Sequence, residues 1–211
     1  MRGWLVAVYL VIVGVYLSGR RPPYSYSNRQ NTLLVIAHPD DEVMFFGPAL
    51  NYFRGESNLH VLCLSTGNSN GLGIEREQEL YRSLRAFGVE NNRIRVVDDA
   101  LLEDGMDWST QYISSSVTEY TNAHNIHTVL TFDQSGVSSH PNHIALNKGV
   151  TAIETVGIRK CFLRTHSIPI KYSSFTYPLQ TSELSISSTF TEYASLNGID
   201  WDTYSQAVIC G

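Results

Sequence analysis

Several common motifs are absent from the 211 residues, and each absence argues against a class of protein. The three cysteines are far apart and form no Cys-x-x-Cys pair, which argues against a disulfide framework and a thiolate metal site. Acidic residues outnumber basic ones, with a net charge of -5 and no basic stripe, so nucleic acid is not an expected partner. No G-x-G-x-x-G or Walker lysine motif occurs, so the usual nucleotide-binding loops are not expected.

Long apolar runs are also scarce, and the exception lies at the N-terminus. Residues 4–17 are uncharged, with one arginine shortly before them and two shortly after. A signal peptide and a membrane helix both fit such a run, but the two arginines make a poor cleavage site. We therefore interpret residues 1–20 as a retained membrane anchor and residues 21–31 as a linker. The flanking arginines place the rest on the cytoplasmic side, and the lack of any Asn-x-Ser/Thr site agrees.

Residues 32–211 are expected to form one domain of the α/β class. Apolar runs typical of strands alternate with helical patterns, which predicts a Rossmann-like, mostly parallel sheet flanked by helices. Ligands of such sheets bind at the carboxyl ends of the strands. The chain after about residue 161 has no clear pattern, and we expect it to add an edge to the sheet or a wall to the pocket. The strands are predicted at residues 33–37, 60–65, 93–97 and 128–132.

The first predicted strand runs directly into His38, Pro39, Asp40, Asp41 and Glu42. Imidazole and carboxylate groups are zinc ligands, and a spare carboxylate can act as a base. Alternatively, one aspartate caps the next helix and Glu42 complements its dipole. The crowding of acids favours the metal interpretation, because like charges repel unless a cation or a helix terminus offsets them.

A second group of candidate ligands, His140 and His143, follows the fourth predicted strand. Because parallel strands end at one edge of a sheet, this pair can approach His38. A single histidine is more often structural than a metal ligand, but two at a predicted helix start are less easily explained that way. A helix N-terminus also disfavours imidazolium, which leaves a ring nitrogen free for a metal.

Together the two motifs resemble the PIG-L family of zinc-dependent de-N-acetylases. The resemblance is carried by residues 37–42 and 132–143, is supported by residues 74–81, and extends over about residues 32–178. One departure is Ser139, where the family pattern usually has glycine.

The resemblance implies a role for each residue of the two motifs. It implies that His38, Asp41 and His143 bind zinc, or another divalent metal. Asp40 would then be the general base, and His140 the acid or the partner of the oxyanion.

The resemblance also implies an activity and a location. The reaction would remove the N-acetyl group of the glycolipid N-acetylglucosaminyl-phosphatidylinositol, giving acetate and glucosaminyl-phosphatidylinositol early in GPI-anchor synthesis. With the anchor, this implies a single-pass protein of the endoplasmic reticulum membrane. Arg76 or Arg85 is then a candidate contact for the inositol phosphate. Two alternatives stay open: a deacetylase of another N-acetylglucosamine conjugate, and an inactive membrane-tethered binding module of the same fold.

Overall fold

The computed structural model of the protein describes residues 30–53, 58–165 and 208–210. These residues build a six-stranded sheet in the order β3-β2-β1-β4-β5-β6. The first five strands along the chain are parallel, and β6 pairs antiparallel with β5 at one edge, so the predicted mostly parallel sheet is confirmed. The strands are β1 (Asn31–Ile36), β2 (Leu59–Cys63), β3 (Ile94–Val96), β4 (Ile126–Phe132), β5 (Arg159–Leu163) and β6 (Val208–Cys210).

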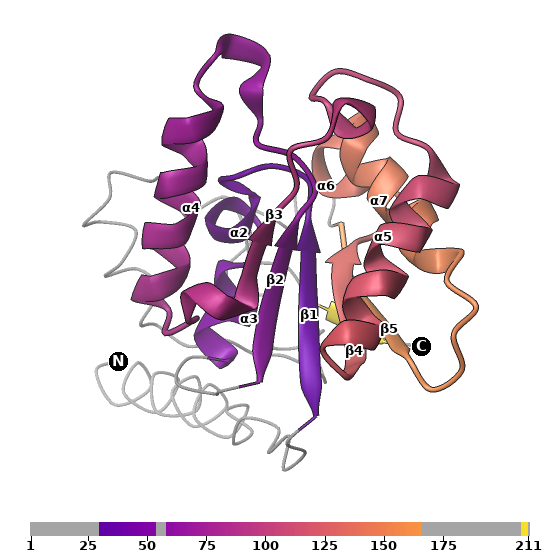
Figure 1. The fold of residues 1–211 in the computed structure, drawn as a ribbon. Coiled ribbons are helices and arrows are strands. Elements are labelled where there is room, and N and C mark those ends of the chain that lie inside the picture. The colour runs from indigo at the N-terminus through magenta and orange to yellow at the C-terminus, as the bar shows by residue number, and fades with distance from the viewer. Residues whose placement is uncertain (1–29, 54–57, 166–207, 211) are drawn as a thin grey trace, which may run out of the picture.

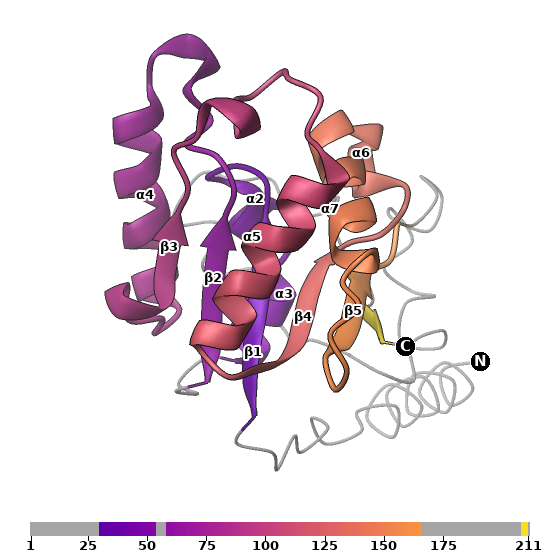
Figure 2. The ribbon, with the colours of Figure 1, turned by 45° about the vertical axis from the view of Figure 1, so that its right-hand side comes forward.

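Helices cover both faces of this sheet (Figures 1 and 2). Helices α2, α3 and α4 lie on one side, whereas α5 and α7 lie on the other and pack against each other. Short α6 lies in the connection between β4 and α7. The helices are α2 (Asp41–Met44), α3 (Gly47–Tyr52), α4 (Gly73–Ala86), α5 (Thr110–Ala123), α6 (Gly136–Ser139) and α7 (Pro141–Thr151), with 3-10 turns η1 (Asn68–Asn70), η2 (Asn91–Arg93) and η3 (Ala100–Leu102).

Strand β1 lies between β2 and β4 in the middle of the sheet. All of its residues after Asn31 are buried, as expected for a parallel strand covered on both faces. The strand begins at Asn31, which the sequence assigned to the linker. The reason is a tertiary contact, because the Asn31 side chain donates a hydrogen bond to the backbone oxygen of His124 at 2.9 Å.

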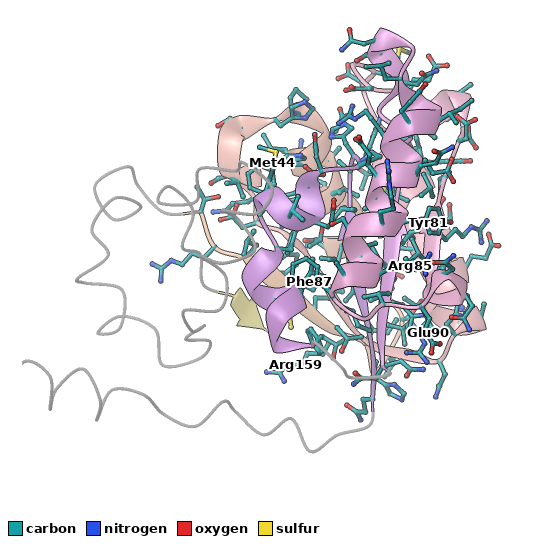
Figure 3. The ribbon with its side chains drawn as sticks, turned by 90° about the vertical axis from the view of Figure 1, so that its left-hand side faces the viewer. Met44, Tyr81, Arg85, Phe87, Glu90 and Arg159 are labelled. Carbon is teal, nitrogen blue, oxygen red and sulfur yellow. The ribbon has the colours of Figure 1, made fainter. Side chains whose placement is uncertain are left out.

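Helix α4 is amphipathic. Leu80 and Leu84 are buried under it, and Phe87 follows them into the core. Arg85 is exposed on the outer face (Figure 3). Gly88, at φ 88°, follows the end of the helix in the left-handed region that favours glycine, as is common after a helix C-terminus.

Strands β5 and β6 come from the part of the chain that the sequence left unassigned. Strand β6 adds an edge to the sheet, which was one of the two expectations. Its register places Cys210 opposite Cys161, and Cys161 is disulfide-bonded. The spacing of the cysteines argued against a disulfide framework but did not reveal this single disulfide, because strand pairing brings together residues that are far apart in the sequence. Cys63 is a free, buried thiol.

The predicted membrane anchor, residues 1–20, lies outside the described residues, as does the linker up to residue 29. Within the three described ranges, no helix is both long and apolar enough to cross a bilayer. The anchor therefore stays a prediction.

Candidate metal centre

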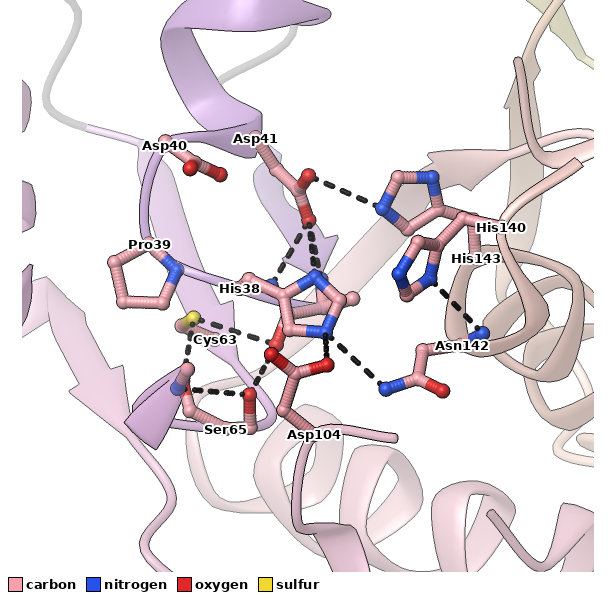
Figure 4. A network of polar contacts seen from close by, with 12 residues as sticks. His38, Pro39, Asp40, Asp41, Cys63, Ser65, Asp104, His140, Asn142 and His143 are labelled. Carbon is pink, nitrogen blue, oxygen red and sulfur yellow. Dashed lines mark hydrogen bonds and ion pairs between the residues drawn. The ribbon is translucent and has the colours of Figure 1, made fainter. Parts of the chain in front are cut away.

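The candidate site lies at the carboxyl ends of β1 and β4, two neighbouring strands whose following helices cover opposite faces of the sheet. A switch of this kind opens a crevice at the sheet edge, where α/β proteins bind ligands. Figure 4 shows side chains from three segments meeting here: residues 38–41 after β1, His140, Asn142 and His143 at the start of α7, and Asp104 from the loop after β3.

Asp41 is a deeply buried carboxylate of the cluster, with only 2% of its surface exposed. Its Oδ2 accepts hydrogen bonds from the backbone N–H groups of Ala37 and His38, both at 2.9 Å. Its Oδ1 lies 3.1 Å from Nε2 of His143. The backbone thus holds one oxygen and leaves the other directed at the histidine.

In its neutral form, His143 presents a lone pair to that oxygen. Its Nδ1 lies 3.1 Å from the backbone oxygen of Gly136, a contact that requires a proton on Nδ1 and so assigns the tautomer. In the neutral ring Nε2 then carries no proton, and it is buried without a hydrogen-bond partner. Stacking on Phe132, with ring centroids 3.9 Å apart, fixes the ring plane. Two acceptors facing each other at 3.1 Å repel, and a bound cation would satisfy both.

His38 is the third group of the cluster. Its Nδ1 lies 3.8 Å from Oδ2 of Asp41, and its ring centroid lies 5.8 Å from that of His143. Burial lowers the pKa of His38, although the nearby Asp41 charge raises it. The side chain is therefore kept in the neutral form that binds metals.

His140 takes part in a different way. It is the N-cap residue of α7, and its Nδ1 accepts a hydrogen bond from the backbone N–H of Asn142 at 3.3 Å. The proton of the neutral ring is then on Nε2, which makes that nitrogen a donor rather than a metal ligand. Burial, with His143 nearby, lowers the pKa of His140.

The structure thus offers a metal two overlapping sets of ligands. Nitrogen atoms of His38, His140 and His143 all lie within 4.8 Å of one another, so a metal could be held by the three histidines. The hydrogen bonds favour the set expected from the sequence, in which Asp41 takes the place of His140. The orphaned Nε2 of His143 and the free Oδ1 of Asp41 fit a cation, whereas the Nδ1 of His140 is already used.

Asp40 lies beside Asp41 and has an unusual backbone, with φ 108°. Its carboxylate contacts the Arg76 guanidinium at 2.8 Å, and 51% of its side chain is exposed. Arg76 also donates to the backbone oxygens of Pro39 and Gly67, both at 2.8 Å, so its guanidinium is engaged at the site. Partial burial and the Asp41 charge raise the pKa of Asp40 to about 6, although the Arg76 charge opposes this rise. A carboxylate of this pKa suits a base that works near neutral pH.

The simple helix-cap interpretation of these acids does not hold. Asp40 is the N-cap residue of α2 but makes no side-chain cap hydrogen bond, and Asp41 binds backbone N–H groups that precede the helix. Glu42 is buried, and its Oε2 accepts from the backbone N–H of Asp40 at 2.9 Å. Burial raises the pKa of Glu42 to about 7.

Three further features were not expected from the sequence. Asp104 lies 3.4 Å from Nε2 of His38, and it lines a cavity of about 290 Å³ together with the loop of residues 65–69. Trp108 packs at 5.8 Å from the His38 ring. Ser139 has a φ of 61°, in the left-handed region that favours glycine, so its departure from the family pattern falls at a strained position. No local pattern marks Asp104, because it is one of several acids in an irregular loop.

Comparison with known proteins identifies related sequences. A family model described as PIG-L, GlcNAc-PI de-N-acetylase, matches residues 33–154. A probable N-acetylglucosaminyl-phosphatidylinositol de-N-acetylase of Schizosaccharomyces pombe is 38% identical over 158 residues, covering 72% of this chain and 64% of its own length. The Bos taurus de-N-acetylase of that name is 37% identical over 129 residues, covering 60% of this chain and 51% of its own length.

Solved structures support the fold. N,N'-diacetylchitobiose deacetylase of Pyrococcus horikoshii aligns with a TM-score of 0.52 at 18% identity, covering 65% of this chain and 61% of its own. A conserved protein of Thermus thermophilus aligns with a TM-score of 0.51 at 20% identity, covering 63% of this chain and 65% of its own. The chain spans about half to two thirds of the length of the curated relatives named above. Because the family model spans more than half of the 211 residues, the chain belongs to the PIG-L family.

Proposed function

We propose that the chain is a zinc-dependent hydrolase that removes the acetyl group from N-acetylglucosaminyl-phosphatidylinositol. The observation that carries the metal is the buried Nε2 of His143, which has no hydrogen-bond partner and faces Oδ1 of Asp41 at 3.1 Å. The substrate is proposed from the names of the curated relatives, which are N-acetylglucosaminyl-phosphatidylinositol de-N-acetylases. In this proposal His38, Asp41 and His143 bind the metal.

A zinc ion held by His38, Asp41 and His143 would supply Lewis acidity for the acetamide carbonyl and would lower the pKa of a bound water towards neutrality. The remaining steps are proton transfers by the chain itself.

Asp40 takes the proton of the attacking water as that water adds to the acetamide carbon. The Nε2–H of His140 donates to the carbonyl oxygen as negative charge develops there. When the carbon–nitrogen bond breaks, Asp40 returns the proton it took from the water to the departing amine, and acetate is the second product. Arg76 keeps the Asp40 carboxylate at the end of β1 while its proton comes and goes.

The proposal includes a location, because a phosphatidylinositol glycolipid is held in a membrane. Residues 1–20 are proposed as the anchor in the endoplasmic reticulum membrane, and the arginines after it favour a domain on the cytoplasmic side. This topology is independent of the chemistry and has its own test below.

The activity is tested with the full chain in detergent and radiolabelled N-acetylglucosaminyl-phosphatidylinositol. Acetate release should stop in a zinc chelator and return when zinc is added back. Free N-acetylglucosamine serves as the control substrate. If it were hydrolysed as fast as the glycolipid, the enzyme would act on another N-acetylglucosamine conjugate. If the metal-loaded chain released no acetate, it would be an inactive binding module.

A further inference from the structure

His38 has a second partner on the side of its ring away from Asp41. Its Nε2 lies 3.1 Å from the side-chain nitrogen of Asn142 and 3.4 Å from Oδ1 of Asp104 (Figure 4). Asn142 is almost fully buried, and the Asp104 side chain is 20% exposed. Nδ1, on the other side of the ring, faces Oδ2 of Asp41. The ring is thus held between the proposed metal site and these two side chains.

The ring nitrogen of His38 that carries the proton determines whether each neighbouring side chain must accept or donate a hydrogen bond. If Nδ1 gives its lone pair to a metal beside Asp41, Nε2 carries a hydrogen and needs an acceptor. Asn142 directs its amide nitrogen, a donor, at Nε2, although the reversed amide would present oxygen instead. The Asp104 carboxylate accepts a hydrogen bond whichever way the amide is turned.

The loop that carries Asp104 is fixed on both sides, so the contact does not depend on a free chain segment. Leu102 is fully buried just before it. Just after it, the indole N–H of buried Trp108 donates to the backbone oxygen of Glu103 at 2.9 Å, while the Trp108 ring packs against His38. Asp104 is therefore held next to His38 by the packing of its own loop.

We propose that Asp104 is a positioning residue of the metal centre. It accepts the hydrogen of His38 Nε2, which fixes the tautomer of the ring and turns Nδ1 towards Asp41 and the metal. Asn142 also faces Nε2, but its side chain is an amide. Asp104 supplies a carboxylate to the same nitrogen from another loop. The inference rests on the proposed metal site.

A different role for Asp104 makes a different prediction. Asp104 also lines the cavity of about 290 Å³, where carboxylates could accept hydrogen bonds from substrate hydroxyls. A substrate contact would raise KM and leave zinc affinity unchanged. A positioning residue, in contrast, changes zinc affinity in the absence of substrate, because histidine partners outside the ligand set orient the ligand.

The test is the zinc dissociation constant of the full chain in detergent, measured by competition with a chromophoric chelator. Asp104→Asn should weaken zinc binding by about 10-fold to 100-fold. Asn142→Asp should restore it in the double variant, because the carboxylate then faces Nε2 from the other side. The matched control is Asp107→Asn, an exposed position of the same loop that removes one charge. The visible spectrum of the cobalt-substituted protein should shift in Asp104→Asn and recover in the double variant.

An unchanged zinc affinity in Asp104→Asn would overturn the inference and leave the metal site intact, and a raised KM would then assign Asp104 to the substrate. Equal weakening in Asp107→Asn would also overturn it, because a general loss of negative charge would explain the effect. A parent chain that bound no zinc would overturn the metal site and this inference together.

Discussion

The contact between Asp40 and Arg76 sets the acidity of the proposed base. The charge and hydrogen bond of Arg76 lower the pKa of Asp40, whereas partial burial and the Asp41 charge raise it. The arginine is held in turn by the backbone oxygens of Pro39 and Gly67. Gly67 is needed here, because its φ is 63° and a Cβ at this position would lie 2.3 Å from Nη1 of Arg76.

Arg76→Gln should shift the pH dependence of the reaction. A base must be ionised to accept a proton, so kcat/KM falls as pH drops through the pKa of Asp40. Removing Arg76 raises that pKa, so the acidic limb should move to higher pH than in the parent. The measurement is the pH profile of kcat/KM at equal zinc loading, with the exposed Arg82→Gln on the same helix as the control. An unmoved limb in Arg76→Gln would separate Asp40 from the base.

At the level of the elements, α5 and α7 meet at Gly149, which is buried in α7. A Cβ at this position would lie 2.3 Å from Cγ2 and 2.5 Å from Cβ of Ile113 in α5. The closeness of the two helices therefore depends on the missing side chain. Because α7 also carries His143, this contact links helix packing to the site.

Gly149→Ala should destabilise the protein by about 1–3 kcal/mol, because the added methyl group overpacks the contact with Ile113. Urea unfolding of the full chain measures this. The exposed Thr151→Ala in the same helix is the control, and adding Ile113→Val should recover part of the loss because the two residues touch. A parental unfolding midpoint for Gly149→Ala would show that α5 and α7 do not approach this closely.

The sequence predicted the elements whose signal is local. Strand β1 was found because its apolar run is continuous. Strand β5 was missed, because it begins with the polar side chains of Arg159 and Lys160 and buries only alternate positions.

The candidate site was predictable to the same extent. His38 and His143 could be brought together from the sequence because parallel strands share a carboxyl edge. Asp104 could not be found, since no periodicity relates its loop to the end of β1. The contact of Arg76 with Asp40 could not be found either, because it depends on tertiary packing, and the role of Arg76 or Arg85 at the inositol phosphate stays a prediction.

At the scale of the whole molecule, the disulfide of Cys161 and the proposed cytosolic location disagree. The cytosol keeps thiols reduced, whereas the lumen of the endoplasmic reticulum permits disulfides. If the domain faces the cytosol, protease added to sealed microsomes should digest it, and Cys161 should react with a maleimide on denaturation without prior reduction. Protection from protease, with Cys161 reacting only after reduction, would place the domain in the lumen and contradict the proposed topology.

The proposed roles of the adjacent aspartates are tested by measuring zinc content and turnover of the glycolipid in the same variants. Asp41→Ala should lose both, because it removes one of three protein ligands, and His143→Ala should behave alike. Asp40→Asn should keep the zinc content of the parent while turnover falls by about 10²-fold to 10⁴-fold, since only the base is removed. An Asp40→Asn protein that is metal-free, or that turns over at the parental rate, would contradict the account.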